Sequence, residues 1–388
     1  MKHTLGISVY PDVSPLEDIK KYIELSSKYG FKKIFSSMFS VEGSKEEVLD
    51  YFEELIAFSH KHGMIVDLDV NPDLFKRLDA SIDDLSVFSE IGVDILRMDQ
   101  SFGKDKDFEL MNNKYGIDIE FNSNIKVVDG LVKAGANPED ILVCYNFYPQ
   151  RYTGFGWDVF REMSAELKSY GDVNIGAFVS SNNENTHGVW DSKDGLPTVE
   201  RLRYLPIDTQ ARILLATGLI NDIIIGNAYA SEDELRSLKK VYDNHSFDIC
   251  NEGLKESIES GTFTVKSSQI IQLKPELYEK VSDVEKDILY NFAPHISIER
   301  NNEFIWRSRM SRIKDERSIE PRTSDKKHFD RGDVLIVNDN YKHYAGEVEI
   351  ALGKVENDGE RNLVARIKED ELIMLDLIDS GILVKFIK

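Results

Sequence analysis

The chain has 388 residues, of which 41% are hydrophobic and 30% charged, and this composition is globular rather than disordered. Single hydrophobic cores stop growing near roughly 250–300 residues, so the length predicts two domains. The net charge of −21 repels phosphate backbones and anionic lipid, which makes nucleic acids and membrane surfaces poor partners. Solubility alone would also account for such a charge.

The cysteines and the N-terminal residues indicate the cellular compartment of the protein. The two cysteines, Cys144 and Cys250, form no disulfide framework, which fits a reducing environment. The first ten residues enter a strand pattern without a basic and then apolar signal region. No apolar run reaches the ~18 residues needed to span a bilayer. We therefore expect a cytoplasmic protein.

The first part of the chain alternates short apolar strands with helical segments. The eight predicted strands cover residues 5–10, 33–38, 64–70, 94–100, 117–123, 141–147, 174–180 and 222–228. The helices predicted between and after them cover residues 15–29, 45–62, 72–91, 125–134, 157–169, 198–217 and 232–244. This alternation implies parallel strands with right-handed crossovers, and eight such units predict an α/β fold, a (β/α)8 TIM-like barrel. The alternative is an open doubly wound sheet, but no glycine-rich phosphate motif follows the first strand.

The regular alternation of strands and helices ends at about residue 261, after which strands and turns become more frequent. The apolar runs there cover residues 262–273, 295–306, 332–341, 346–355 and 381–387. We expect a barrel domain over residues 1–260 and a smaller all-β domain over residues 261–388, closed or sandwich-like.

The inward faces of strands three to six carry polar side chains. Side chains alternate between the two faces of a strand, and the apolar set of a barrel strand packs outward on the helices. In residues 117–123 this rule directs Glu120 and Asn122 inward. Applied to all four strands, it brings a polar set to one barrel mouth: Asp69, Arg97, Asp99, Glu120, Asn122, Asn146 and Tyr148. The structural alternative is a salt-bridge layer that closes the barrel, with Arg97 paired to Asp69 or Asp118.

Several carboxylates in one mouth permit a limited set of reactions. A pair of them, one protonated and one ionised, supports glycoside hydrolysis. Metal-dependent chemistry competes, because Asp and Glu also bind Mg²⁺. The histidines form no zinc or iron pattern, and no predicted strand has a lysine near its C-terminal end for Schiff-base chemistry.

The segment over residues 180–203 is a long polar loop after the seventh strand. It carries His187, Trp190 and Asp191, and long loops at a barrel mouth are usually functional. Trp190 could stack on a sugar ring or pin its own loop.

The second domain contains a local positive island in this acidic chain. Arg307, Arg309, Arg312 and Arg331 supply it. Guanidinium groups bind phosphate and carboxylate by paired hydrogen bonds, although an interdomain salt-bridge patch is the alternative.

The ordered set of motifs resembles the 6-phospho-N-acetylmuramidases. The motifs are GISVYP (6–11), LRMDQSFG (96–103), IEFNSN (119–124), CYNFYPQRYTG (144–154), GLPTVE (195–200), IIIGNA (223–228), WRSRMSR (306–312), RGDVLIVNDNYKHYAGE (331–347) and residues 382–386. The resemblance implies a TIM-like barrel with a C-terminal cyclophilin-like domain. It also implies hydrolysis of the β-1,4 bond between N-acetylmuramic acid 6-phosphate and N-acetylglucosamine, in cytoplasmic peptidoglycan recycling. No cofactor and no metal are implied, and the partner is this small phosphorylated disaccharide.

The resemblance also implies roles for individual residues. Asp99 and Glu120 are the catalytic candidates. The substrate-binding candidates are Asp69, Arg97, Asn122, Asn146, Tyr148, Arg151, His187, Arg307, Arg312, Arg331, Tyr344 and Glu347. The chain departs from the family pattern at Tyr145 and Gln150, so altered specificity is open. Another barrel enzyme on sugar phosphates, such as a metal-dependent isomerase or lyase, and a non-catalytic sugar-phosphate-binding protein are the alternatives.

Overall fold

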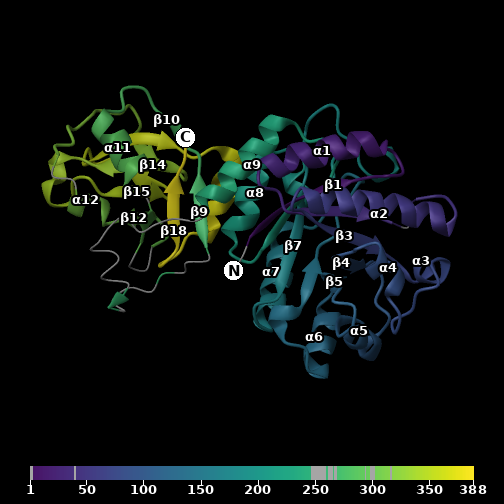
Figure 1. The fold of residues 1–388 in the computed structure, drawn as a ribbon. Coiled ribbons are helices and arrows are strands. Elements are labelled where there is room, and N and C mark those ends of the chain that lie inside the picture. The colour runs from purple at the N-terminus through teal and green to yellow at the C-terminus, as the bar shows by residue number, and fades with distance from the viewer. Residues whose placement is uncertain are drawn as a thin grey trace. The chain divides into compact units, whose positions relative to one another are not determined.

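A computed structural model describes residues 3–38, 41–245, 259–260, 265, 269–292, 294–297, 302–314 and 317–388 (Figure 1). The chain divides into two compact units, one of Met1–Leu214 with Leu219–Tyr242 and the other of Leu215–Gly218 with Asp243–Lys388. The predicted boundary after residue 260 lies beside stretches outside the described residues, and it stays a prediction. Cys250 also lies outside them.

The first unit is a closed barrel of eight parallel strands in sequence order, which confirms the predicted fold. Its strands are β1 (Thr4–Val9), β2 (Lys33–Ser37), β3 (Ile65–Val70), β4 (Ile95–Met98), β5 (Asp118–Asn122), β6 (Leu142–Cys144), β7 (Asn174–Val179) and β8 (Asp222–Ile225). The sheet closes because β8 pairs in parallel with β1.

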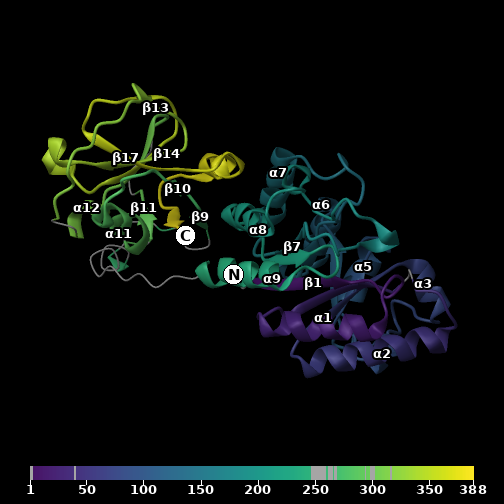
Figure 2. The same cartoon turned by 90° about the horizontal axis from the view of Figure 1, so that it is seen from above.

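Helices surround this sheet, and α1 and α2 lie side by side outside it in both ribbon views (Figures 1 and 2). The helices are α1 (Leu16–Lys28), α2 (Lys45–Lys61), α3 (Pro72–Arg77), α4 (Ser86–Glu90), α5 (Lys104–Met111), α6 (Ile125–Ala134), α7 (Trp157–Ser169), α8 (Ile207–Ala216) and α9 (Glu232–Asn244). Short 3₁₀ helices add η1 (Pro138–Asp140), η2 (Val189–Asp191) and η3 (Glu200–Leu202).

Two predicted helices were wrong in extent. The helix expected over residues 72–91 is split into α3 and α4, because the chain turns at Asp79, whose φ of 58° is left-handed. The helix expected over 198–217 begins only at Ile207, directly after Pro206, whose ring would clash inside a helix. Helix α5 was not predicted.

The two faces of the barrel strands divide apolar from polar residues. Leu68, Leu96 and Ile119 are buried and belong to the apolar set, opposite in parity to the charged set. The strand register makes Ser37, Asp69, Arg97 and Glu120 successive neighbours across β2 to β5. Neighbours in register point to the same face, so the charged residues gather inside the barrel.

The second unit consists mostly of strands, as predicted. Its sheets have the orders β10-β17-β14-β15-β12, β11-β18-β9 and β13-β16. The strands are β9 (Ile270–Leu273), β10 (Glu276–Leu277), β11 (His295–Ile296), β12 (Ile305–Ser308), β13 (His328–Phe329), β14 (Asp333–Val337), β15 (Val348–Ala351), β16 (Val355–Glu356), β17 (Arg361–Arg366) and β18 (Leu383–Phe386). Its helical segments are α11 (Asp283–Asn291), α12 (Ser311–Lys314), η4 (Asp339–Tyr344) and η5 (Glu369–Leu377).

The sequence runs located these strands only in part. Residues 262–264, 266–268 and 298–301 of the predicted runs lie outside the described residues. Strand β17, which pairs with both β10 and β14, was not predicted. The cyclophilin-like assignment stays a prediction.

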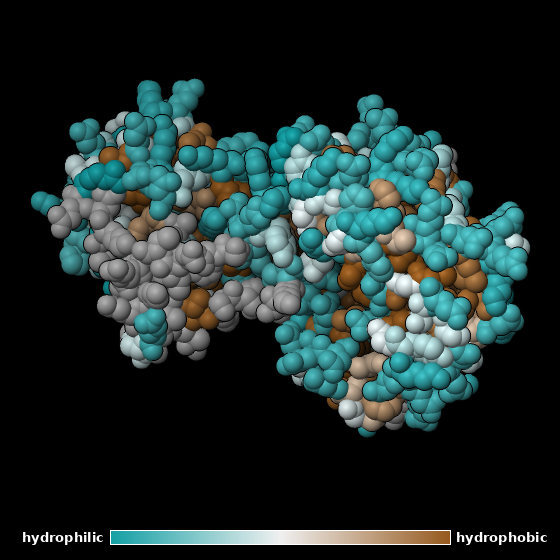
Figure 3. Space-filling view, in the orientation of Figure 1, coloured by the Kyte–Doolittle hydropathy of each residue, from teal (hydrophilic) through white to brown (hydrophobic). Residues whose placement is uncertain are grey.

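The visible face of the barrel unit is mostly hydrophilic, with hydrophobic side chains between the polar ones (Figure 3). Within the described parts of the chain, no helix combines the length and apolar character needed to cross a membrane.

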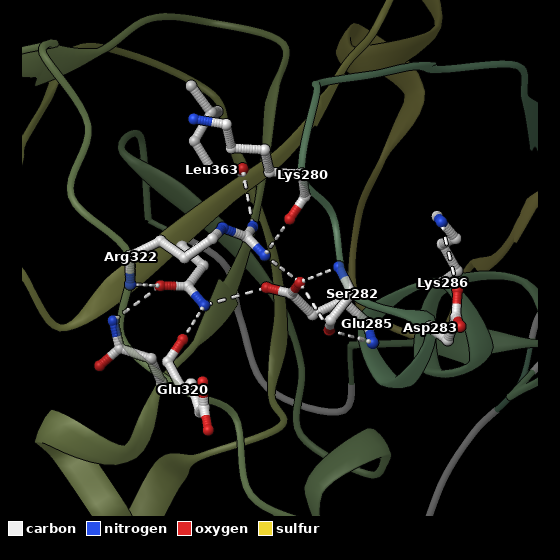
Figure 4. Close-up of polar contacts among 10 residues, drawn as sticks. Lys280, Ser282, Asp283, Glu285, Lys286, Glu320, Arg322 and Leu363 are labelled. Atoms are coloured by element: carbon white, nitrogen blue, oxygen red, sulfur yellow. Dashed lines mark hydrogen bonds and ion pairs between the residues drawn. The ribbon is translucent and has the colours of Figure 1, made fainter.

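A buried polar network stabilises the second unit (Figure 4). Glu285 accepts hydrogen bonds from the backbone N–H and hydroxyl of Ser282, both at 2.8 Å, and pairs with Arg322. Its other oxygen accepts from Asn362 Nδ2 at 2.9 Å. Burial alone would raise the pKa of Glu285, but Arg322 and the other donors lower it overall. Glu285 is therefore an ionised carboxylate with a full set of donors.

We expect Glu285→Ala to destabilise the second unit by about 3–5 kcal/mol, because it removes the buried carboxylate that accepts from Ser282, Arg322 and Asn362 together. Asp283→Ala, at a fully exposed position in the first turn of the same helix, is the matched control and should cost less than about 0.5 kcal/mol. Hydrogen exchange of the β14 and β17 amides measures the difference. Equal exchange in the two variants would contradict the assignment.

Candidate active site

Arg97, on β4, is the centre of the polar contacts at the barrel mouth. Its Nη1 donates to Asp69 Oδ1 at 2.6 Å, and its Nη2 donates to the side-chain oxygens of Asn122 and Asn146. Its Nε lies 3.9 Å from Glu120 Oε1. The guanidinium is buried, and its hydrogen bonds are accepted by three side chains, on β3, on β5 and just after β6.

The guanidinium fixes the orientation of both amides. Arg has donors only, so Asn122 and Asn146 must each turn their oxygen toward it. The Asn122 Nδ2 is then free to donate to the backbone oxygen of Asp99 at 2.8 Å. Arg97 thus holds the backbone of Asp99 through Asn122.

A cavity of about 330 Å³ opens at this mouth. Its lining consists of Tyr10, Phe35, Ser37, Asp69, Arg97, Asp99, Asn146, Phe147, Tyr148, Pro149, Val189 and Trp190. The structure therefore brings Asp69, Arg97, Asp99, Asn146 and Tyr148 of the predicted set to one surface. Aromatic walls with a few convergent polar groups are typical of small-molecule sites.

Asp69 and Asp99 are the two carboxyl groups in this lining. Burial raises the pKa of Asp69 to about 6, although Arg97 opposes the shift and Asp99 and Glu120 add to it. A carboxyl group with this pKa is partly protonated near neutral pH, as a general acid must be.

A second charged layer is centred on Lys33 of β2. Lys33 Nζ lies 2.8 Å from Glu120 Oε2, 2.9 Å from Asp67 Oδ2 and 3.7 Å from Asp222 Oδ2. All these groups are buried. Burial would lower the pKa of Lys33, but the three carboxyl groups raise it well above its ordinary value. The salt-bridge layer weighed as the structural alternative is therefore present, with Arg97 paired to Asp69.

Protons are shared unequally in this layer. Burial, together with the neighbouring charge of Glu120, raises the pKa of Asp67 well above its usual range. Burial would also raise the pKa of Glu120, but Lys33 and Arg97 outweigh it and the pKa is lowered. When the pair holds one proton, that proton is therefore on Asp67, and Glu120 is the ionised member.

Glu120 contacts Lys33 and Arg97 and is not one of the described residues that line the cavity. Its catalytic role stays a prediction, and its placement favours action through Arg97. Among the described residues, no group of three or more His, Cys, Asp or Glu side chains is arranged to hold a metal ion.

The loop over residues 180–203 anchors the end of β6. Thr198 donates from Oγ1 to the backbone oxygen of Asn146 at 3.0 Å, and the Tyr148 N–H donates to Pro197 O at 3.2 Å. A Cβ atom at Gly226 would lie 2.4 Å from the backbone oxygen of Leu196, so only glycine fits beside this loop.

Trp190 lies on the same loop at the cavity wall, and 72% of it is exposed. Its φ of 57° is left-handed and costs energy for an aromatic residue. A ring this exposed does not pin its loop by burial, so its accessible face is available to a ligand.

Arg151 and His187 do not belong to the described lining of the cavity. Arg151 is exposed and pairs with Asp194 at 2.6 Å. His187 Nε2 lies 3.0 Å from Ser14 Oγ, and its ring packs edge-on against Tyr229. Both predicted binding roles remain predictions.

The second unit brings together four of its five predicted residues. Arg307 Nε donates to Glu347 Oε1 at 2.7 Å, and Arg312 Nε lies 3.8 Å from Glu347 Oε2. Both guanidinium groups lie over the Tyr344 ring, at 5.5 and 4.5 Å. Arg331 is bound elsewhere, to the Leu352 backbone oxygen and to Asp376. We call Arg307, Arg312, Tyr344 and Glu347 the arginine–tyrosine cluster.

Sequence reasoning missed Lys33, Tyr10 and Phe35. They belong to the first two strands or follow them directly, outside strands three to six. Extended to β1 and β2, the alternation rule directs Tyr10, Lys33 and Phe35 inward, because Lys33 pairs in register with inward-facing Gly6.

Comparison with known proteins identifies the family. The family model described as "6-phospho-N-acetylmuramidase, N-terminal" matches residues 5–240, and the corresponding C-terminal model matches residues 271–387. The chain belongs to the 6-phospho-N-acetylmuramidase family. The named activity is that of a glycosidase, which agrees with a carboxyl pair in a cavity.

Solved structures of similar proteins agree in fold. The crystal structure of an uncharacterized B. cereus protein is 33% identical, with a TM-score of 0.82 and full coverage of both chains. A conserved Enterococcus faecalis protein with an unknown function is 23% identical over 99% of this chain and 96% of that one, with a TM-score of 0.64. A search of curated proteins found no significant match.

The two departures from the family pattern lie outside the described cavity lining. Tyr145 is buried, and its hydroxyl meets Ser164 Oγ at 2.8 Å on α7. Gln150 is exposed, and its backbone oxygen accepts from Thr153 and Arg203.

We expect opposite outcomes from Asp67→Asn and Glu120→Gln in this 6-phospho-N-acetylmuramidase family member. Asn mimics a protonated Asp67 and should change the free energy of unfolding by less than about 1 kcal/mol at pH 7. Glu120→Gln removes an ionised partner from Lys33 and Arg97 and should cost about 3–5 kcal/mol. Denaturant unfolding measures both.

The pH dependence supplies the control. Because the pKa of Asp67 is higher in the folded state than in the unfolded state, Asp67 stabilises the protein at a pH below the ordinary carboxyl pKa of about 3.9. This contribution is lost as the pH rises through the pKa that Asp67 has in the folded state. Asp67→Asn should lack that loss. A larger cost for Asp67→Asn than for Glu120→Gln at pH 7 would contradict the proton assignment.

Proposed function

We propose that the chain hydrolyses the β-1,4 bond between N-acetylmuramic acid 6-phosphate and N-acetylglucosamine, in cytoplasmic recycling of peptidoglycan. The observation that carries this proposal is the pairing of Asp69 and Asp99 on one cavity, with the pKa of Asp69 raised to about 6 by burial. The membership of the 6-phospho-N-acetylmuramidase family supports the same reaction.

The two carboxyl groups take different roles. Asp69 in its protonated form gives its proton to the bridging oxygen as the glycosidic bond breaks, which releases one sugar as an alcohol. Asp99 acts at the anomeric carbon, either as a nucleophile or as the base for a water molecule. Arg97 stabilises the Asp69 carboxylate left behind, because it lies 2.6 Å from that oxygen.

The other cavity residues suit a sugar ring. Trp190 presents an exposed aromatic face at the wall, and sugar rings stack on such faces. The Asn146 amide and the Tyr148 hydroxyl group supply the polar contacts that fix ring orientation. Burial raises the pKa of Tyr148, so its hydroxyl stays a donor at neutral pH.

The arginine–tyrosine cluster supplies a place for an anionic group within the second unit. Tyr344 holds two guanidinium groups side by side by cation–π contact. Adjacent guanidinium groups favour phosphate and carboxylate, and the proposed substrate carries both. Arg331, which pairs with Asp376, is the weaker of the predicted anion ligands.

The test is incubation of the full chain with the phosphorylated disaccharide and mass spectrometry of the products. We expect the two free monosaccharides, and Asp69→Asn or Asp99→Asn should lower kcat by about 10²-fold or more. The value of kcat/KM should fall with a midpoint near pH 6 as Asp69 loses its proton. This alkaline fall should be absent in Asp69→Asn.

Asp73→Asn is the matched control, because Asp73 is exposed in α3 directly after the same strand. It should retain wild-type rates. Cleavage of the unphosphorylated disaccharide at the same rate would contradict the substrate assignment, and full activity of both active-site variants would contradict the mechanism. Loss of activity with a chelator would favour a metal-dependent reaction instead.

A further inference from the structure

Lys33 is a buried cation that the proposed hydrolysis does not use. It begins β2, and its side chain is 2% exposed inside the barrel. Its ammonium group is surrounded by carboxyl groups from β3, β5 and β8. Burying this charge costs several kcal/mol, and salt bridges inside proteins often contribute little net stability. A role beyond packing is therefore worth testing.

Glu120 connects Lys33 to the cavity. One of its oxygens, Oε2, lies 2.8 Å from Lys33 Nζ, and the other, Oε1, lies 3.9 Å from Arg97 Nε. Arg97 in turn binds Asp69 at 2.6 Å. Two anions therefore face the same guanidinium, Asp69 from the cavity and Glu120 from the layer around Lys33.

Glu120 is held back from Arg97 by its contact with Lys33. The shorter distance is that between Glu120 Oε2 and Lys33 Nζ, and Asp67 is the other neighbouring carboxyl group of Glu120. An anion with an oxygen this close to Arg97 would move toward the guanidinium if Lys33 were removed. The guanidinium would then interact less with Asp69.

We propose that Lys33 and Glu120 are positioning residues that set the protonation of Asp69. They do so by controlling how strongly the Arg97 guanidinium interacts with Asp69 and how strongly with Glu120. The consequence for catalysis rests on the proposed function, but the coupling itself concerns the folded protein alone.

The charged and titratable groups that act on Asp69 come from three strands of the barrel. Arg97 and Asp99 come from β4 and the residue after it, Glu120 from β5, and Tyr10 from the end of β1. Burial raises the pKa of Tyr10 above the range of a titration between pH 4 and 9, so it stays neutral there. Lys33 contacts Glu120, Asp67 and Asp222, and Glu120 in turn faces Arg97.

The proposal predicts shifts of opposite sign. Glu120→Gln removes a competing anion, so Arg97 interacts more fully with Asp69 and the Asp69 midpoint should fall. Lys33→Met releases Glu120 toward Arg97, so the Asp69 midpoint should rise. We expect each shift to be about 0.5–1 pH unit, below the 1–3 units of a direct charge contact. Lys33→Arg keeps the charge and should restore most of the wild-type midpoint.

The experiment is a titration of the folded full chain labelled with ¹³C at the aspartate carboxyl carbons. Comparison with Asp69→Asn assigns the Asp69 signal. Lys168→Met is the matched control, because Lys168 is a partly buried barrel cation bonded to Asn221 and to the Val173 backbone, away from the Arg97 contacts. It should leave the Asp69 midpoint unchanged while still lowering stability.

Shifts of opposite sign in Glu120→Gln and Lys33→Met support the proposal. Unchanged midpoints, or shifts of the same sign, overturn it, since loss of packing alone would act alike in both variants. If Glu120→Gln does not fold, the rise in Lys33→Met and its reversal in Lys33→Arg decide the matter. The titration needs no substrate, so its result is independent of whether the disaccharide is hydrolysed.

Discussion

The Arg97 guanidinium is the interaction on which the barrel mouth depends. It is buried, it can only donate, and its acceptors come from β3, β5 and the end of β6. Burying a charge is costly unless the charge is paired and hydrogen-bonded, so the donors of Arg97 decide how the surrounding side chains are oriented. Arg97 holds Asp69 at the cavity by a hydrogen bond. Arg97 also orients Asn122, which in turn donates to the backbone oxygen of Asp99. The proposed acid and its partner carboxylate are therefore positioned by one side chain.

The barrel makes this arrangement possible because its register is fixed. Parallel pairing sets Asp69, Arg97 and Glu120 side by side on one face, and the helices cover the other. A site built on strands is more rigid than one built on loops, which suits a reaction that needs two carboxyl groups held in place. The loop over residues 180–203 then adds Trp190 and ties itself to the β6 end through Thr198 and Pro197.

Much of this could be predicted from the sequence, and the failures have physical reasons. Strand alternation gave the inward face of β3 to β6 correctly, since side chains strictly alternate. Alternation predicts the face of the strand to which a side chain points, but not how deep the side chain lies along the barrel axis. Glu120 was therefore expected at the mouth, whereas it contacts Lys33 beneath Arg97. Aspartate tolerates a left-handed backbone but does not require it, so the turn at Asp79, which splits a predicted helix, could not be predicted from its residue type. Arg331 belongs to the same positive island in the sequence as the other arginines, but in the structure it is bound elsewhere. Strand pairing between distant parts of the chain decides which residues meet in the second unit.

The most direct test of the account is Arg97→Lys, measured by hydrolysis of the phosphorylated disaccharide with circular dichroism as the check on folding. Lysine keeps the charge but lacks the planar fork that reaches Asp69, Asn122 and Asn146 together. The account predicts a folded protein in which kcat/KM falls by about 10²-fold, because Asp69 and Asp99 lose their shared support. A folded Arg97→Lys variant with wild-type kcat/KM would contradict it.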